Sequence, residues 1–220
     1  LFLLFWFSED RVNRMGPGFP TWYQVQFGAW LFFFLPVTCA LVPWITWDIE
    51  ELGQTWKHAR VQPVPTQTHF LVKVLGHAIL LLISQLLFST LLAVGGLWLR
   101  HELPVLDMGP LSLPLLLRLS ALSTLALLPL MALHTWLSSR LRTLGPVLVI
   151  ALLGMWITSQ FPKGVSYAYA SPWAAATLAS DLVFKQLGSL VGVLVSSLGF
   201  TAVFIALGAI DFSRREERNG

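Results

Sequence analysis

Residues 70–99 read FLVKVLGHAILLLISQLLFSTLLAVGGLWL, thirty residues that carry one formal charge, Lys73. A helix of about 20 apolar residues already crosses the hydrocarbon core of a bilayer. A helix buried in the core of a soluble protein does not need so long an apolar run. The stretch therefore predicts a membrane-spanning helix, and its length indicates a helix that is tilted in the bilayer.

Apolar runs of the same character recur along the chain. Pro36 and Pro43 interrupt one of them, but a lipid-embedded helix tolerates proline where its neighbours satisfy the freed backbone groups. The run 1–7 is interpreted as the end of a span that begins before Leu1. We expect one transmembrane domain over residues 1–220, an all-α polytopic helical bundle of about six spans: 1–7 in part, 25–47, 70–99, 111–137, 146–158 and 187–210.

The composition excludes a soluble domain. Hydrophobic residues make up 55% of the chain and charged residues 11%, and the mean hydropathy is +0.70. Soluble domains carry about 25% charged residues, so this chain has too little charge to cover a surface that faces water. Cys39 is the only cysteine and lies within an apolar run, which rules out an intrachain disulfide and predicts a buried apolar side chain.

Lysines and arginines near the ends of the predicted spans indicate the orientation. Eight of them fall on one side of the membrane and six on the other, so the positive-inside rule favours a cytoplasmic C-terminus. The eight on the predicted cytoplasmic side are Lys57, Arg60, Lys73, Arg140, Arg142, Arg214, Arg215 and Arg218.

The segment 48–68, DIEELGQTWKHARVQPVPTQT, is polar and amphipathic. On helical spacing Ile49, Leu52 and Trp56 share one face, which predicts a short helix lying at the cytoplasmic membrane surface. Pro63 and Pro65 end this helix and stiffen the connection to the next span. Charges of both signs on its exposed side suit docking to a soluble partner, and a solvated surface helix without a partner is the alternative.

This segment resembles the permease subunits of ABC exporters. The pattern is an acidic pair, a glycine, a threonine, an aromatic and basic residues, then Pro-Val-Pro and a lysine in the next span. The similarity is to drug, polysaccharide and lantibiotic-export permeases, and most of all to small lantibiotic-immunity permeases. It implies a coupling helix that docks on an ATPase subunit, formed by Glu50, Glu51, Gly53, Thr55, Trp56, Lys57 and Arg60, with Lys73 following.

The resemblance also implies partners and a location. The chain has no Gly-x-x-x-x-Gly-Lys-Ser/Thr phosphate loop, so ATP and Mg²⁺ would be bound by a separate ATPase subunit. Two permease chains, identical or related, would enclose a pathway for an amphipathic substrate in a bacterial cytoplasmic membrane. Membrane lipids are expected partners and nucleic acid is not. The semi-polar stretch 164–186 falls where such permeases place an extracellular re-entrant segment before the last span.

His69, Lys73 and His77 recur at every fourth position and form one stripe on the predicted third span. Lys73 lies about one turn into that span, where its amine can snorkel to the surface or take a specific role in an interface. A lysine between two histidines does not suit a metal or haem site. We therefore expect no metal and no cofactor in this chain, and no catalytic residues.

Two other functions remain open at this point. A membrane-embedded subunit that handles electrons or haem would need paired histidine ligands facing each other across helices. A structural or assembly membrane protein would have no ATPase partner, and changes in segment 48–68 would have no effect on it.

Overall fold

The computed structural model describes residues 19–54, 64–102, 110–141, 143–160, 166–184 and 188–219. Every regular element in these ranges is a helix, which confirms the predicted all-α membrane bundle. The predicted partial span 1–7 lies outside the described residues. The helices are α3 (Phe19–Ala29), the π-helix η1 (Trp30–Phe34), α4 (Leu35–Leu52), α6 (Thr66–Glu102), α7 (Leu113–Arg140), α8 (Leu144–Ser159), the 3-10 helix η3 (Ser166–Ala170), α9 (Ala175–Phe184) and α10 (Leu190–Asn219).

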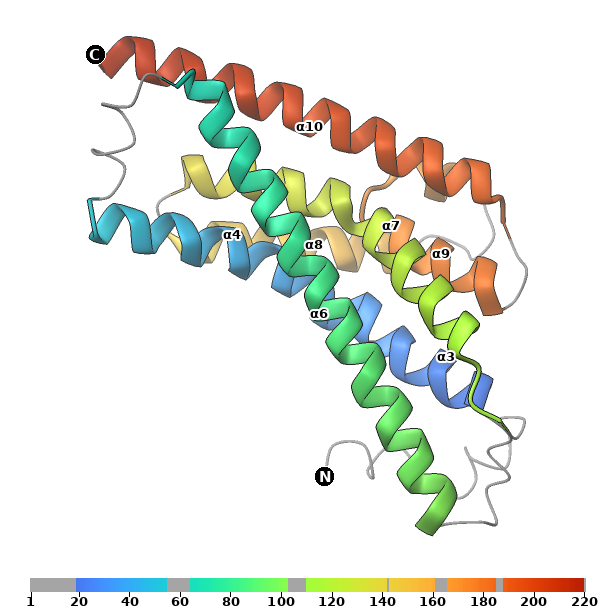
Figure 1. Cartoon of the computed structure of the whole chain (residues 1–220). Helices are drawn as coiled ribbons and strands as arrows, with labels where there is room; N and C mark the ends of the chain where they lie inside the picture. The colour runs from blue at the N-terminus through green and yellow to red at the C-terminus, as the bar shows by residue number, and fades with distance from the viewer. Residues whose placement is uncertain are drawn as a thin grey trace.

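Helix α7 lies at the centre of the bundle. It packs against α4, α6, α9 and α10, and Figure 1 shows α10 running along one side while α6 crosses the front obliquely. Helices α6 and α10 leave large apolar side chains uncovered, such as Val72, Leu91 and Val191, each more than 60% exposed. Such long apolar helices need lipid around them, so the chain is a multi-pass membrane protein.

Four helical stretches in the described ranges are long and apolar enough to cross a membrane: Trp22–Leu52, Gln67–Glu102, Leu113–Arg140 and Leu190–Arg214. Helix α8, in the place of the predicted span 146–158, has 16 residues. At 1.5 Å per residue it is about 24 Å long, less than the hydrocarbon core of about 30 Å. By length α8 reaches most of the way through a bilayer.

The helix through residues 19–52 continues past Pro36 and Pro43 without ending. Pro36 lacks the N–H that would close a normal turn, and its ring clashes with the carbonyl four residues earlier. The turn before it is widened into η1, in which the N–H of Leu35 donates to the carbonyl of Trp30. The π-helix therefore gives the proline ring the room that an α-helical turn would not.

The two ends of the bundle are distinguished by the helices that meet there. Helices α4, α7 and α10 finish, and α6 and α8 begin, at what we call the basic end, which holds Lys73, Arg140 and Arg214. Trp47 and Phe70 both contact Phe212 there, with ring centroids 5.5 and 6.2 Å apart. The opposite end, called the far end, holds η3, α9 and the start of α10.

The predicted re-entrant stretch 164–186 contains η3 and α9 in its described part. Helix α9 has only 10 residues and buries Ala175, Ala176 and Ala179 against its neighbours. The carbonyl of Tyr169 accepts a hydrogen bond from Ser196 of α10, and its hydroxyl accepts the backbone N–H of Ser189 at 2.8 Å. A short helix packed on protein in this way fits a segment that enters the membrane region without crossing it.

Candidate functional site at the basic end

Lys73 is held in place by α4. Its ammonium forms an ion pair with Glu50 and lies 4.0 Å from the ring centroid of Trp47. The Lys73 side chain is only 15% exposed, and its ammonium is held between a carboxylate and an aromatic ring of α4. A charge this far inside an apolar helix needs a partner, and the last turns of α4 supply both a carboxylate and an aromatic face.

Aromatic side chains join this ion pair to α10. Phe212 contacts both Trp47 of α4 and Phe70 of α6. Phe70 is fully buried and lies against Gly208, where an added Cβ would overlap the phenyl ring. The close approach of α6 and α10 at this point therefore depends on the glycine.

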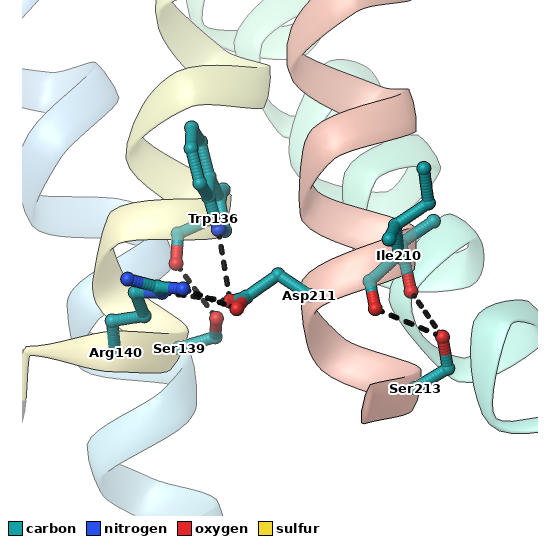
Figure 2. A network of polar contacts seen from close by, with 7 residues as sticks. Trp136, Ser139, Arg140, Ile210, Asp211 and Ser213 are labelled. Atoms are coloured by element: carbon teal, nitrogen blue, oxygen red, sulfur yellow. Dashed lines mark hydrogen bonds and ion pairs between the residues drawn. The ribbon is translucent and has the colours of Figure 1, made fainter. Parts of the chain in front are cut away.

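A second polar group at the basic end joins α7 to α10 (Figure 2). The Arg140 guanidinium meets the Asp211 carboxylate with both Nε and Nη2, and Nε lies 2.8 Å from Oδ2. The indole N–H of Trp136 donates to the same Oδ2 at 3.1 Å. Asp211 is 15% exposed and Arg140 51% exposed, so the carboxylate is the more buried partner and depends on these donors.

The predicted coupling segment leaves α4 through a strained turn. Asp48–Leu52, the first residues of the segment, continue α4 and do not begin a separate helix. Gly53 caps the helix, and Gln54 adopts a left-handed backbone with φ of 51°. A non-glycine residue rarely takes this conformation, and such strain gathers at functional positions.

The structure brings together some of the predicted site residues. Glu50 and Lys73 are in contact, Gly53 ends the helix, and Glu51 lies exposed at the same end. Thr55, Trp56, Lys57 and Arg60 lie outside the described residues. Because Glu50 precedes segment 53–65 and Lys73 follows it, their ion pair anchors both sides of that segment to one point of the bundle.

A family model described as an ABC-2 family transporter protein matches residues 1–158. The chain belongs to the ABC-2 transporter family. No curated protein and no solved structure gives a match. The resemblance to ABC permeases is thereby confirmed at the level of the family. The chain is the permease subunit of an ABC transporter, and permeases of this family work with an ATPase partner and often form dimers.

The interior of the permease contains a polar contact that the sequence analysis missed. His77 of α6 lies between Thr46 of α4 and Thr135 of α7, with its Nε2 2.8 Å from the first hydroxyl and its Nδ1 2.9 Å from the second. Each hydroxyl also lies within hydrogen-bond distance of a carbonyl of its own helix, that of Pro43 or Met131. A neutral imidazole has one N–H, so one threonine accepts from His77 and donates to its carbonyl, and the other donates to the ring. We call this three-helix contact the basic-side bridge.

A similar contact, the far-side bridge, lies two turns along α6. The indole N–H of Trp30 donates to Gln85 Oε1 at 3.1 Å, and Gln85 Nε2 donates to Ser123 at 2.8 Å. One turn further on, the hydroxyls of Ser89 and Ser120 are 2.5 Å apart. The four-residue spacing of His69, Lys73 and His77 continues to Gln85 and Ser89, and following it would have revealed this polar face.

Both ring nitrogens of His77 are engaged by threonine hydroxyls, which is how a hydrogen-bonded core histidine is held. Across the described ranges, no three His, Cys, Asp or Glu side chains lie close enough together to hold a metal ion. The polar face of α6 is therefore best understood as the surface that joins α4, α6 and α7 inside the membrane.

Proposed function

We propose that this permease belongs to an ATP-driven exporter that moves an amphipathic substrate across a bacterial cytoplasmic membrane. The observation that carries the proposal is the Glu50–Lys73 ion pair, which fixes both sides of the predicted coupling segment to the bundle. A segment anchored in this way transmits a push from a docked ATPase to α4 and α6 together. Phe212 and Asp211 then carry the displacement to α10 and α7.

The chemistry of the spans supports an amphipathic substrate. The buried polar side chains of the two bridges are neutral and bond to one another and to backbone carbonyls. They leave no set of charges that would bind an ion or a phosphorylated sugar. A lantibiotic-like peptide, a lipid or a hydrophobic drug needs mostly apolar contacts, which these helices provide in excess.

The proposal includes the contact with the ATPase, a second permease chain and a physiological role. The ATPase would contact the coupling segment through Glu51, Trp56, Lys57 and Arg60. A second permease chain, identical or related, would complete the pathway. The segment 48–73 favours an immunity role, in which export of a lantibiotic-like peptide protects the producing cell.

The test is to co-purify the full-length permease with the ATPase encoded beside it and to compare variants. Glu51→Lys reverses an exposed charge at the basic end, and Trp56→Ala removes the predicted apolar anchor. Glu102→Lys is the matched control, because Glu102 is also an exposed acidic residue in the last turn of its helix but lies at the far end. Complex formation and ATPase rate are measured for each variant.

We expect Glu51→Lys and Trp56→Ala to release the ATPase or to abolish its stimulation by the permease, while Glu102→Lys behaves as wild type. Elution profiles would show that all three variants remain folded. If no ATPase co-purifies, or if both basic-end variants match the wild type, segment 48–68 is not the coupling site. If Glu102→Lys is equally defective, the effect is one of charge and not of position.

A further inference from the structure

An apolar groove runs between α6 and the helix that precedes it in the bundle. Its volume is about 440 Å³, and it follows α6 from Leu80 to Leu91 and the η1–α4 helix from Trp30 to Val42. At 1.5 Å per residue both walls are about 17 Å long, well within the 30 Å of a hydrocarbon core. Residues 80–91 lie in the middle of α6, so the groove is at the depth of lipid tails, away from both charged ends.

Both ends of the groove are closed by side chains. The hydrogen bond between Thr46 and His77 lies one turn beyond Val42 and Leu80, towards the basic end. At the far end the Trp30 indole stacks on Phe88 with ring centroids 4.2 Å apart and planes 9° apart. The groove thus has a defined length and is more than an accidental gap between two helices.

The floor and the rim of the groove differ in exposure. Leu81 and Met131 form the floor and are each 1% exposed. Leu80, Leu87 and Leu91 form the rim and are 47%, 60% and 69% exposed. The groove is therefore open sideways to the bilayer and closed towards α7.

The lining carries no charge. None of its eleven residues is ionisable, and the Thr38 hydroxyl donates to the carbonyl of Phe34 at 2.8 Å, so it is already satisfied. A charged ligand would lose its hydration here, with the Ser84 hydroxyl as the other polar side-chain group of the lining besides Thr38 and the Trp30 indole. The surface complements uncharged hydrocarbon.

The size of the groove distinguishes between possible apolar ligands. The groove has a volume of about 440 Å³ over a length of about 17 Å. A helix is about 10–12 Å across, so a span of a second chain would lie over the exposed rim of the groove and not inside it. Carbon atoms pack at about 3.5–4.0 Å, which lets a single file of methylene groups fill it.

We propose that this groove is a binding site for one hydrocarbon chain of an amphipathic membrane lipid, which enters sideways from the bilayer. Trp30, which closes the far end, is the first residue of the π-helix η1, and π-helical turns recur at functional sites. The site stands independently of the proposed export function, because it needs neither ATP nor the ATPase partner.

The experiment uses the purified permease in bilayer nanodiscs that contain phosphatidylethanolamine with a photoreactive diazirine near the middle of one acyl chain. After illumination, adducts are mapped by mass spectrometry. Leu82 and Leu86 are the internal reference, because they lie on the same helix at the same depth, are 41% and 42% exposed, and do not line the groove. We expect adducts at Leu80 and Leu91 to exceed those at the reference leucines at least about tenfold, equivalent to 1.4 kcal/mol of preference.

A pair of variants separates a site from general lipid contact. Leu87→Trp fills the groove from its rim and is expected to remove the excess labelling at Leu80 and Leu91. Leu86→Trp adds the same side chain outside the groove and is expected to leave that labelling unchanged. Uniform labelling along α6 in the wild type would mean ordinary surrounding lipid and would overturn the proposal. Weak labelling of the groove, together with a disulfide between two Leu87→Cys chains, would show that a second chain covers it and would also overturn it.

Discussion

The stability lost when a polar bridge is removed depends on whether a hydrogen-bond donor is left without an acceptor. With His77→Leu, the hydroxyls of Thr46 and Thr135 keep the carbonyl acceptors of their own helices. With Gln85→Leu, the indole N–H of Trp30 loses its acceptor, and a buried donor without a partner costs about 1–3 kcal/mol. We expect Gln85→Leu to lower the thermal unfolding temperature more than His77→Leu in the same detergent.

Adding Trp30→Phe to Gln85→Leu removes the orphaned donor and should recover part of the loss. An equal fall in the unfolding temperature of the two single variants would contradict this explanation. So would a double variant that is less stable than Gln85→Leu alone.

For His134 we expect the opposite effect of a substitution on stability. The residue is fully buried in α7, and within the described part of the chain neither of its ring nitrogens has a hydrogen-bond partner. Replacing such a group by an apolar one of similar size removes a desolvation penalty. We expect His134→Leu to leave the thermal unfolding temperature unchanged or to raise it. A fall of several degrees would show that the histidine is bonded to something else in the membrane, such as a water molecule.

At the scale of helices, the sequence predicted the elements that depend on a single property, the length of an apolar run. The apolar run 70–99 lies inside α6, and all but the first two residues of the run 111–137 lie inside α7, because the length of an apolar run is what a bilayer demands. The π-helix at Trp30–Phe34 could not be predicted, since proline marks a disturbance but not its geometry. The Glu50–Lys73 pair could not be predicted either, because it depends on how α4 and α6 cross.

Glycine decides how closely α8 packs on the segment before α9. Gly154 is buried, and a Cβ added there would overlap the ring of Trp173, whereas Gly145 on the same helix has open space around it. Alanine favours a helix over glycine by about 1 kcal/mol, while overpacking costs about 1–3 kcal/mol. We expect Gly154→Ala to destabilise the permease and Gly145→Ala to be neutral or stabilising, measured as thermal unfolding. Equal effects at both positions would show that Trp173 moves aside freely.

At the scale of the whole molecule, the bundle has to be rigid where the coupling segment joins it. Two ion pairs achieve this, one between α4 and α6 and one between α7 and α10, and aromatic rings connect them. In each pair one partner is shielded from water, Lys73 or Asp211, while the other, Glu50 or Arg140, is 37% or 51% exposed. Breaking either pair leaves a charge near lipid, where it has few alternatives.

A charge exchange tests whether the Glu50–Lys73 pair acts as a connection or only as a source of charge. Glu50→Lys places two ammonium groups together and should destabilise the permease and weaken its stimulation of the ATPase. Lys73→Glu should do the same with two carboxylates. In the double variant the pair is restored with reversed polarity, so we expect thermal stability and ATPase stimulation to return towards wild type, with a coupling energy of about 0.5–3 kcal/mol in the cycle. The Trp47 ring prefers the cation over the anion, so recovery should be incomplete.

If stability returns but ATPase stimulation does not, the identity of Glu50 matters for docking, and the residue contacts the ATPase as well as Lys73.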